Sequence, residues 1–245
     1  MKISVVTLTR NRLLYLRRLY QSLARNTTNI QDIEWIVVDN GSTDGTREWL
    51  TDLQLPSFLK FIVNPDNSRN MIARNDGIEI AHGEYIAQID DDAFVLKDWD
   101  IRMLKYIDED KNILAVGQEG NYCRPDWSNY FRPGLKPGVG QECDFLTGYC
   151  WMWKNQPSLL YDENFLYIHE ETDLQFQMKL KYSYKFVRCE PVAIHTSQKI
   201  WTPGFTKKWD ERNIELIKSK YWGDKVELER GGLLTYGETK RGKNA

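Results

Sequence analysis

The stretch IEWIVVDNGSTDG, residues 33–45, marks the end of a buried strand and the turn that follows it. The run from Ile33 to Val38 is mostly apolar and rich in β-branched residues, which is typical of a strand covered on both faces. The next six residues, NGSTDG, are a dense cluster of turn formers. Asp39 is therefore expected at the carboxyl end of a central strand.

The same alternation of strand and helix extends on both sides of this stretch. We predict strands over residues 3–7, 33–39, 58–63 and 85–89, and helices after Asn11, around residues 49–53 and over residues 69–81. Asn11 is expected to cap the first of these helices. Strands that alternate with helices at this spacing favour an α/β fold, with a Rossmann-like, mostly parallel central sheet flanked by helices.

The second half of the sequence is less regular. Residues 117–150 are rich in Gly, Pro and aromatic residues, and long irregular stretches of this kind in a compact domain tend to be functional loops. We predict short strands over residues 145–153, 184–188 and 191–195, a helix over residues 170–182, and a C-terminal helix from Thr206 that packs back on the body.

The composition is that of an ordinary globular chain. Of 245 residues, 41% are hydrophobic and 28% are charged, and a net charge of −2 gives no overall attraction to nucleic acid or anionic lipid. No apolar run approaches the roughly 20 residues of a membrane helix, and the first residues lack the apolar core of a signal peptide. The four cysteines form no C-x-x-C pair, so free thiols are expected. These features predict a cytoplasmic protein, with peripheral contact to the inner face of the membrane left open.

Three polar clusters follow predicted strands, at residues 7–12, 39–45 and 90–92. Because the carboxyl ends of parallel strands meet at one edge of a sheet, and ligands bind beyond that edge, these clusters are expected to converge. The acids Asp90, Asp91 and Asp92 are the strongest signal among them. Adjacent carboxylates repel one another, and Mg²⁺ or Mn²⁺, which prefer such oxygens and bridge to phosphates, would offset the repulsion. A solvated acidic turn that caps the next helix is the alternative.

Other single residues have both a functional and a structural interpretation. Asp39 could accept a hydrogen bond from a nucleobase or ribose, or it could close an Asx turn. Arg74 could bind a diphosphate or form a surface salt bridge, and Arg12 and Arg69 have similar interpretations with weaker support.

A second acidic cluster and a histidine stand in the C-terminal half. Glu170 and Glu171 could include a general base with a raised pKa, or they could stabilise the start of a helix as first-turn acids, as Asp173 also could. His195 could bind a metal, or it could be a structural histidine.

The order of these motifs resembles family 2 glycosyltransferases of the GT-A fold. The segments that carry the resemblance are SVVTLTRNR, IVVDNGSTDGT, NPDNSRNMIARNDGIEIAHGEYIAQIDDDAFV, FLTGYCWMW, HEETDLQFQMK, AIHTSQKIW and RNIELIKSKYWG. They span roughly residues 2–222, and their order and spacing are more specific than any one motif.

The resemblance implies a role for each candidate residue. The segment from Thr9 to Arg12 would wrap the base, which Asp39 would also contact, and the resemblance places Arg74 near the base and the diphosphate. Asp90, Asp91 and Asp92 occupy the D-x-D position, with Asp90 and Asp91 on the nucleotide-sugar side. The metal would be held by Asp92 with His195 and Asp90. Glu171 matches the general base, with Glu170 as the second candidate, and Gly148 would border the donor sugar.

The implied activity is metal-dependent transfer of a sugar, with Mn²⁺ or Mg²⁺, from a UDP-, GDP- or dTDP-sugar to an acceptor hydroxyl with inversion. A glycan, a lipid-linked molecule or another hydroxyl compound could be the acceptor, nucleic acid included. Aromatic residues of segment 122–153 would stack on sugar rings or pack in the core: Trp127, Tyr130, Trp151 and Trp153. Two positions depart from the family pattern, since Leu8 replaces a frequent proline and Glu171 a usual aspartate.

The predicted domain organisation is a GT-A domain over residues 1–205, followed by a C-terminal helix and mobile tail over 206–245. Within the domain, residues 1–95 would bind the nucleotide and residues 96–205 would bind the acceptor and carry the base. Two other functions remain open. A nucleotidyltransferase acting on sugar phosphates would favour a Gly-rich phosphate loop with a lysine near the N-terminus, which is not evident here. An inactive nucleotide-sugar-binding module would bind a donor without turning it over.

Overall fold

The structure is a computed structural model, and it describes residues 2–52, 59–65, 70–122, 136–146, 148–165, 170–196 and 203–221. A sheet of eight strands forms its centre, in the order β3-β2-β1-β4-β10-β6-β11-β8. Four neighbouring pairs are parallel, and β10 and β8 run against the others. The predicted α/β class with a mostly parallel sheet is confirmed. The strands of this sheet are β1 (Ile3–Thr9), β2 (Ile33–Asn40), β3 (Leu59–Asn64), β4 (Tyr85–Ile89), β6 (Ile113–Gly117), β8 (Glu142–Cys143), β10 (Cys150–Lys154) and β11 (Lys185–Arg188).

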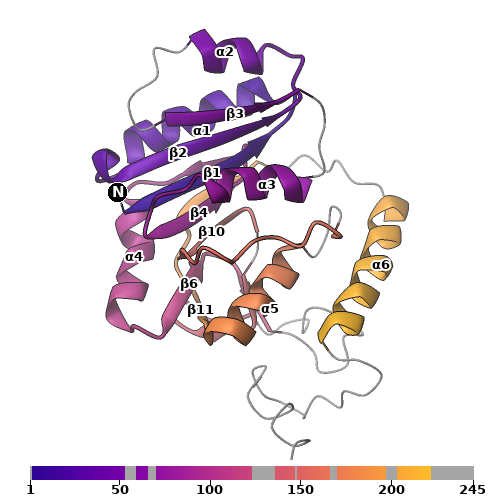
Figure 1. The fold of residues 1–245 in the computed structure, drawn as a ribbon. Coiled ribbons are helices and arrows are strands. Elements are labelled where there is room, and N and C mark those ends of the chain that lie inside the picture. Colours follow the sequence, from indigo (N-terminus) through magenta and orange to yellow (C-terminus); the bar gives the residue numbers. More distant parts are fainter. Residues whose placement is uncertain are drawn as a thin grey trace, which may run out of the picture.

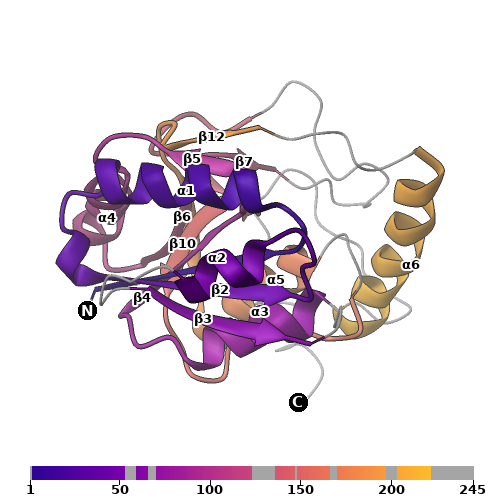
Figure 2. The ribbon, with the colours of Figure 1, turned by 90° about the horizontal axis from the view of Figure 1, so that it is seen from above.

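Helices cover both faces of the sheet (Figures 1 and 2). One face carries α1 (Leu13–Asn26) and α4 (Trp99–Glu109), and the other carries α3 (Asn70–Glu79) and α5 (Glu170–Tyr182). Alternation along the strands gives each face its own core, since Val5 packs with the α1 and α4 side and Val6 with the α3 and α5 side. Three further helices are the 3-10 turn Ile30–Asp32, α2 (Thr46–Asp52) and α6 (Pro203–Tyr221).

Two small sheets complete the fold. The strand β12 (Ala193–His195) pairs antiparallel with β5 (Ala93–Val95), and β7 (Gly120–Asn121) pairs with β9 (Phe145–Leu146). The predicted single strand over 145–153 is therefore wrong. Its first part pairs with β7, a turn follows at Gly148 and Tyr149, and β10 then enters the main sheet between β4 and β6.

The start of α1 also differs from the prediction. Asn11 does not cap this helix, because it adopts a left-handed conformation (φ 54°) and its side chain accepts a hydrogen bond from the Thr43 backbone at 2.7 Å. The Asp44 carboxylate accepts the Leu13 N–H at 2.9 Å instead, so the loop after β2 supplies the cap.

The two tryptophans of β10 belong to the core. Trp151 and Trp153 are fully buried and stack on each other with ring centroids 4.2 Å apart, so they are not free to stack on a sugar. The other two stacking candidates, Trp127 and Tyr130, lie outside the described residues, as do Arg69 and Cys123. Cys143, Cys150 and Cys189 are buried free thiols, as expected. No helix in the described part of the chain is long and apolar enough to cross a membrane.

Candidate active site

The strands β2, β1 and β4 are neighbours, so their carboxyl ends lie side by side. There the Thr9 hydroxyl donates to Asp91 at 2.8 Å, and the Arg12 guanidinium contacts Asp91 (3.3 Å) and Asp92 (2.5 Å). Burial raises the pKa of Asp91 to about 7. The structure thus brings together Thr9, Arg12 and the acidic triplet, and Arg12 offsets part of the repulsion within it.

The pairing of β12 with β5 brings His195 to the same place, opposite Ala93 and beside Asp92. The His195 Nε2 atom lies 3.0 Å from Asp92 Oδ1, and the backbone N–H and hydroxyl of Thr196 both donate to the Asp92 carbonyl. The hydrogen bond to Asp92 raises the pKa of His195. Burial opposes ionisation of Asp92, but the bonds from His195 and Arg12 outweigh it and lower the pKa of this carboxyl.

Asp90, Asp92 and His195 form a candidate metal site. One ligand atom from each lies within 4.8 Å of the others. Two carboxylates and an imidazole suit Mn²⁺, and the carboxylates also suit Mg²⁺. The donor set therefore fits the implied ion, although Arg12 and His195 now contact both Asp92 oxygens.

Arg74, on α3, contacts Asp90, and its Nη2 atom donates a hydrogen bond to Asp90 Oδ1 at 3.2 Å. Burial opposes the charge on Arg74, but Asp90 and the nearby acids outweigh it and raise the pKa of this guanidinium. Its Nε and Nη1 atoms are buried and have no hydrogen-bond partner among the described residues. Buried donors of a charged group without partners are costly, which makes Arg74 a candidate for binding an anionic ligand.

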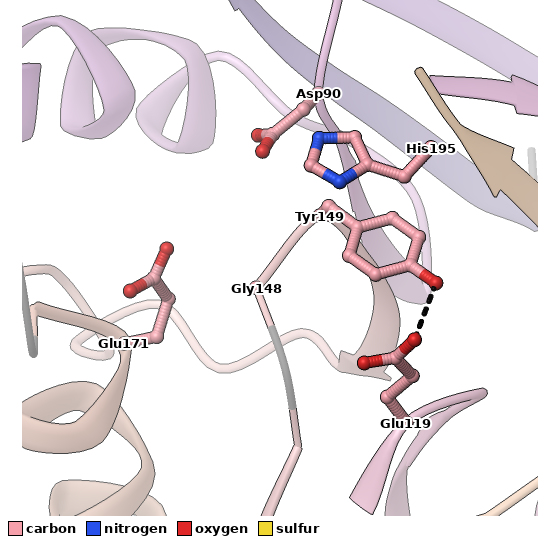
Figure 3. A pocket seen from close by; sticks show the side chains of 6 residues that line it. All are labelled: Asp90, Glu119, Gly148, Tyr149, Glu171 and His195. Carbon is pink, nitrogen blue, oxygen red and sulfur yellow. Dashed lines mark hydrogen bonds between the residues drawn. The ribbon is translucent and has the colours of Figure 1, made fainter. Parts of the chain in front are cut away.

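A cavity of about 540 Å³ opens beside these residues (Figure 3). This is within the usual range for small-molecule sites. It is lined by Asp90, Glu119, Gly148, Tyr149, Glu171 and His195. Asp90 and His195 occupy one side of the cavity, and Glu171 projects toward it from the start of α5. The candidate metal ligands and the candidate base thus share one space.

Glu171 needs the glycine opposite it. A Cβ built on Gly148 would lie 2.7 Å from the carboxyl carbon of Glu171, so a side chain at this position would force the Glu171 carboxylate to move. The Gly148 carbonyl is fixed by a 2.7 Å hydrogen bond from Gln88 Nε2, so the loop has little room to move away. Burial raises the pKa of Glu171, and Arg74 partly opposes this shift.

Glu170, the second base candidate, has a different environment. It does not line the cavity among the described residues, and its buried Oε2 atom has no hydrogen-bond partner there. Burial, together with repulsion from Glu171, raises its pKa. The two adjacent glutamates therefore differ in access, and the one facing the cavity is Glu171.

Asp39 lies at the carboxyl end of β2, as predicted, next to the last residue of the strand, but it does not line the cavity. It is fully buried and accepts the Ser42 backbone N–H at 3.2 Å, which is the turn interaction considered from the sequence. Arg47, from α2, lies 4.0 Å from the same carboxylate.

Two lining residues, Glu119 and Tyr149, are not among the candidates taken from the sequence. The Tyr149 ring stacks on His195, with centroids 4.5 Å apart and planes within 6°, and its hydroxyl donates to Glu119 at 3.1 Å. Burial, reinforced by the charge of Glu119, raises the pKa of Tyr149. Glu119 closely follows β6, so it carries the same signal as Asp39 and Asp90, an acid at the carboxyl end of a strand.

Comparison with known proteins agrees with this geometry. Residues 4–158 match the family model for glycosyl transferase family 2, which is more than half of the chain. The chain therefore belongs to this family. It is 30% identical over 130 residues to the glycosyltransferase GlyG of Streptococcus pneumoniae, covering 53% of this chain and 42% of GlyG. The chain spans only 24%, 24% and 42% of the first curated relatives that it matches.

Solved structures show the same fold. TarS of S. aureus, residues 1–349, has a TM-score of 0.67 at 18% identity, covering 93% of this chain and 67% of that one. The mannosyltransferase PcManGT from Pyrobaculum calidifontis, solved with GDP-Man and Mn²⁺, has a TM-score of 0.65 at 18% identity, covering 92% and 65%. TarS has also been solved with UDP and with UDP-GlcNAc. The predicted GT-A fold is confirmed.

Proposed function

We propose that this chain transfers a sugar from a nucleotide-diphosphate donor to an acceptor hydroxyl, with Mn²⁺ or Mg²⁺ and with inversion. The observation that carries the proposal is the shared cavity, which joins Asp90 and His195 to Glu171. Family membership supports the reaction class, and the nucleotide-sugar complexes of TarS and PcManGT support the donor class. The proposal does not specify the nucleobase or the sugar. It also leaves open whether the acceptor is a glycan, a lipid-linked molecule or a nucleic acid.

In this proposal, Asp92, His195 and Asp90 hold the metal ion. When bound, the ion supplies positive charge that neutralises the leaving diphosphate. The unpartnered donors of Arg74 add hydrogen bonds to the same diphosphate, and Thr9, Arg12, Asp39 and Asp91 shape the nucleotide side. Gly148, whose lack of a side chain leaves room for the Glu171 carboxylate, borders the sugar.

Glu171 acts as the general base in this proposal. Its raised pKa makes the carboxylate a better proton acceptor near neutral pH than an exposed glutamate. It would remove the proton of the acceptor hydroxyl as the hydroxyl oxygen attacks the anomeric carbon from the side opposite the leaving group.

We also propose that the GT-A domain ends near residue 205, where α6 has begun, and that residues 1–95 form its nucleotide-binding half. We propose further that the protein works in the cytoplasm.

The first test is binding. Thermal shift with UDP-, GDP- and dTDP-sugars, each with Mn²⁺, Mg²⁺ or EDTA, should show a metal-dependent stabilisation for at least one donor. The absence of any shift with all donors and ions would contradict the donor site.

The second test separates the enzyme from an inactive binding module. We expect Glu171→Gln to keep donor binding and to lose turnover by about 10²–10⁴-fold, because the base is lost and the shape is kept. Glu170→Gln is the matched control and should retain more activity. If only the Glu170 variant loses turnover, Glu170 is the base, and if the unaltered chain binds donor without transfer or hydrolysis, it is a binding module.

A further inference from the structure

Glu119 lines the cavity but has no role in the proposed reaction. It lies between β6 and β7, across the Gly148 turn from Glu171 (Figure 3). Six residues line the cavity, and three of them, Asp90, Glu119 and Glu171, are acidic. The metal ion and Arg74 would account for the charge of Asp90, and proton transfer uses Glu171. The charge of Glu119 therefore needs a separate explanation.

The backbone that carries Glu119 is held firmly. The Gln118 side-chain oxygen accepts the backbone N–H groups of Val192 (2.9 Å) and Ala193 (2.6 Å), at the start of β12. Arg188 donates to the Gln118 carbonyl at 3.1 Å. The segment is thus fixed from two neighbouring elements, and Glu119 is positioned before any ligand binds.

The side chain of Glu119 is oriented as well. Gln118 Nε2 donates to the Tyr149 hydroxyl, and that hydroxyl donates to Glu119 Oε1 at 3.1 Å. Tyr149 in turn stacks on His195, so its position is fixed from the metal side of the cavity. A carboxylate oriented in this way presents its second oxygen in a defined direction.

That second oxygen is free to accept a ligand. Across the described residues, the one hydrogen bond to the Glu119 carboxylate is that from the Tyr149 hydroxyl to Oε1, and no lysine or arginine pairs with it. An ionised carboxylate can only accept hydrogen bonds, and sugar hydroxyls are donors that suit it. A sugar that carried its own carboxylate would instead meet a like charge in a confined cavity.

We propose that Glu119 determines specificity, accepting hydrogen bonds from hydroxyls of the sugar in the cavity and excluding sugars that carry a carboxylate. This inference rests on the proposed function. It narrows the proposed donors to nucleotide-sugars whose sugar carries no carboxylate.

The test compares donors that differ by one carboxylate. Calorimetric titration in Mn²⁺ buffer would measure affinities for UDP-glucose and UDP-glucuronate, with UDP alone as the reference, and for GDP-mannose and GDP-mannuronate with GDP as the reference. We expect the unaltered chain to bind the donor whose sugar is uncharged with an affinity about tenfold or more higher than that for the donor with the carboxylate. Glu119→Gln, which keeps the shape and removes the charge, should reduce that preference by about tenfold. Glu119→Ala should also weaken binding of the uncharged donor, because the acceptor oxygens are gone.

Glu79→Gln, an exposed glutamate on α3, is the matched control and should leave the preference unchanged. Normal binding of the uncharged donor with an unchanged preference in Glu119→Gln would overturn the role of Glu119 alone. Failure of the unaltered chain to bind any donor or nucleoside diphosphate would overturn the proposed function and this inference with it.

Discussion

Glu170 is a buried acid one residue away from the proposed base. Its Oε2 atom has no hydrogen-bond partner among the described residues, whereas Glu171 opens into the cavity. Burial favours the neutral form of Glu170 and raises its pKa to about 8. A carboxyl that stays protonated in the folded chain links folding to proton uptake.

This linkage predicts how stability varies with pH. In the unfolded chain Glu170 loses its proton near about pH 4.3, but in the folded chain it keeps it up to the raised value. The folded state therefore binds more protons between the two values, and the free energy of unfolding falls as the pH rises through that range. In Glu170→Gln we expect the curve between about pH 5 and pH 8 to be flatter by up to about 1.4 kcal/mol per pH unit.

Urea unfolding at several pH values measures this slope. Glu79→Gln, on the surface of α3, should follow the unaltered chain at every pH. If the Glu170→Gln curve also ran parallel to that of the unaltered chain, a protonated buried Glu170 would be ruled out.

Local sequence signals singled out some residues of the candidate site and missed others. The acids Asp90, Asp91 and Asp92 could be singled out because they directly follow a strand, which local periodicity reveals. His195 could be associated with them only through the family resemblance, since the β12 and β5 pairing joins residues about a hundred positions apart. Tyr149 was missed because β10 enters the sheet at a place that no local pattern specifies.

Among the elements, α6 is tied to α5 by buried polar contacts. The fully buried Asp173, on α5, accepts hydrogen bonds from Lys220 Nζ (2.8 Å) and from the Tyr221 hydroxyl (2.6 Å). Lys220 also donates to Asp162 at 2.7 Å. Figure 1 shows α6 standing beside α5, the helix whose first turn carries Glu170 and Glu171. A displacement of α6 would therefore change the position of α5, which carries the proposed base Glu171 in its first turn.

We expect Lys220→Met to destabilise the fold by about 1–2 kcal/mol, because it leaves a buried carboxylate without its cation. The value is below that of a fully buried pair, since the Lys220 side chain is 35% exposed. Thermal unfolding would measure the loss. The control is Lys105→Met, which breaks an exposed 3.9 Å pair with Glu109 and should change stability by less than about 0.5 kcal/mol. Equal effects of the two variants would show that Lys220 does not anchor α6.

The strands β1 to β4 and the helices between them were predicted well, because β1, β2 and β3 are each followed by a helix, whereas β5, α4 and β6 were not predicted. The prediction failed at residues 145–153, where an aromatic run looks like one strand. A run of apolar residues does not show whether it forms one strand or two strands with different pairing partners. Here β9 pairs with β7 and β10 pairs with β4.

At the scale of the whole molecule, β10 joins the two halves of the sheet. It lies antiparallel between β4 and β6, so neither of these strands can pair with the other. Its side chains Trp151 and Met152 fill the cores of opposite faces. The family match, residues 4–158, ends just after this strand.

Truncation tests that role. We expect a chain ending at residue 165, which keeps β10, to protect its N-terminal half from limited proteolysis better than a chain ending at residue 148, which exposes the edge of β4. The yield of protected fragment, followed by mass spectrometry, is the measurement. Equal protection in both chains would mean that β1 to β4 are stable without β10.

The position of β10 also has a consequence for synthesis. About 60 residues separate Ile89, the end of β4, from Cys150, the start of β10. At about 5–20 residues per second, the ribosome needs roughly 3–12 s to make them. During that time the edge of β4 would present unpaired backbone N–H and C=O groups, which can pair with strands of other nascent chains. Slow translation of residues 90–150 would lengthen this exposure, so codon choice in that segment should influence how much protein accumulates in native form.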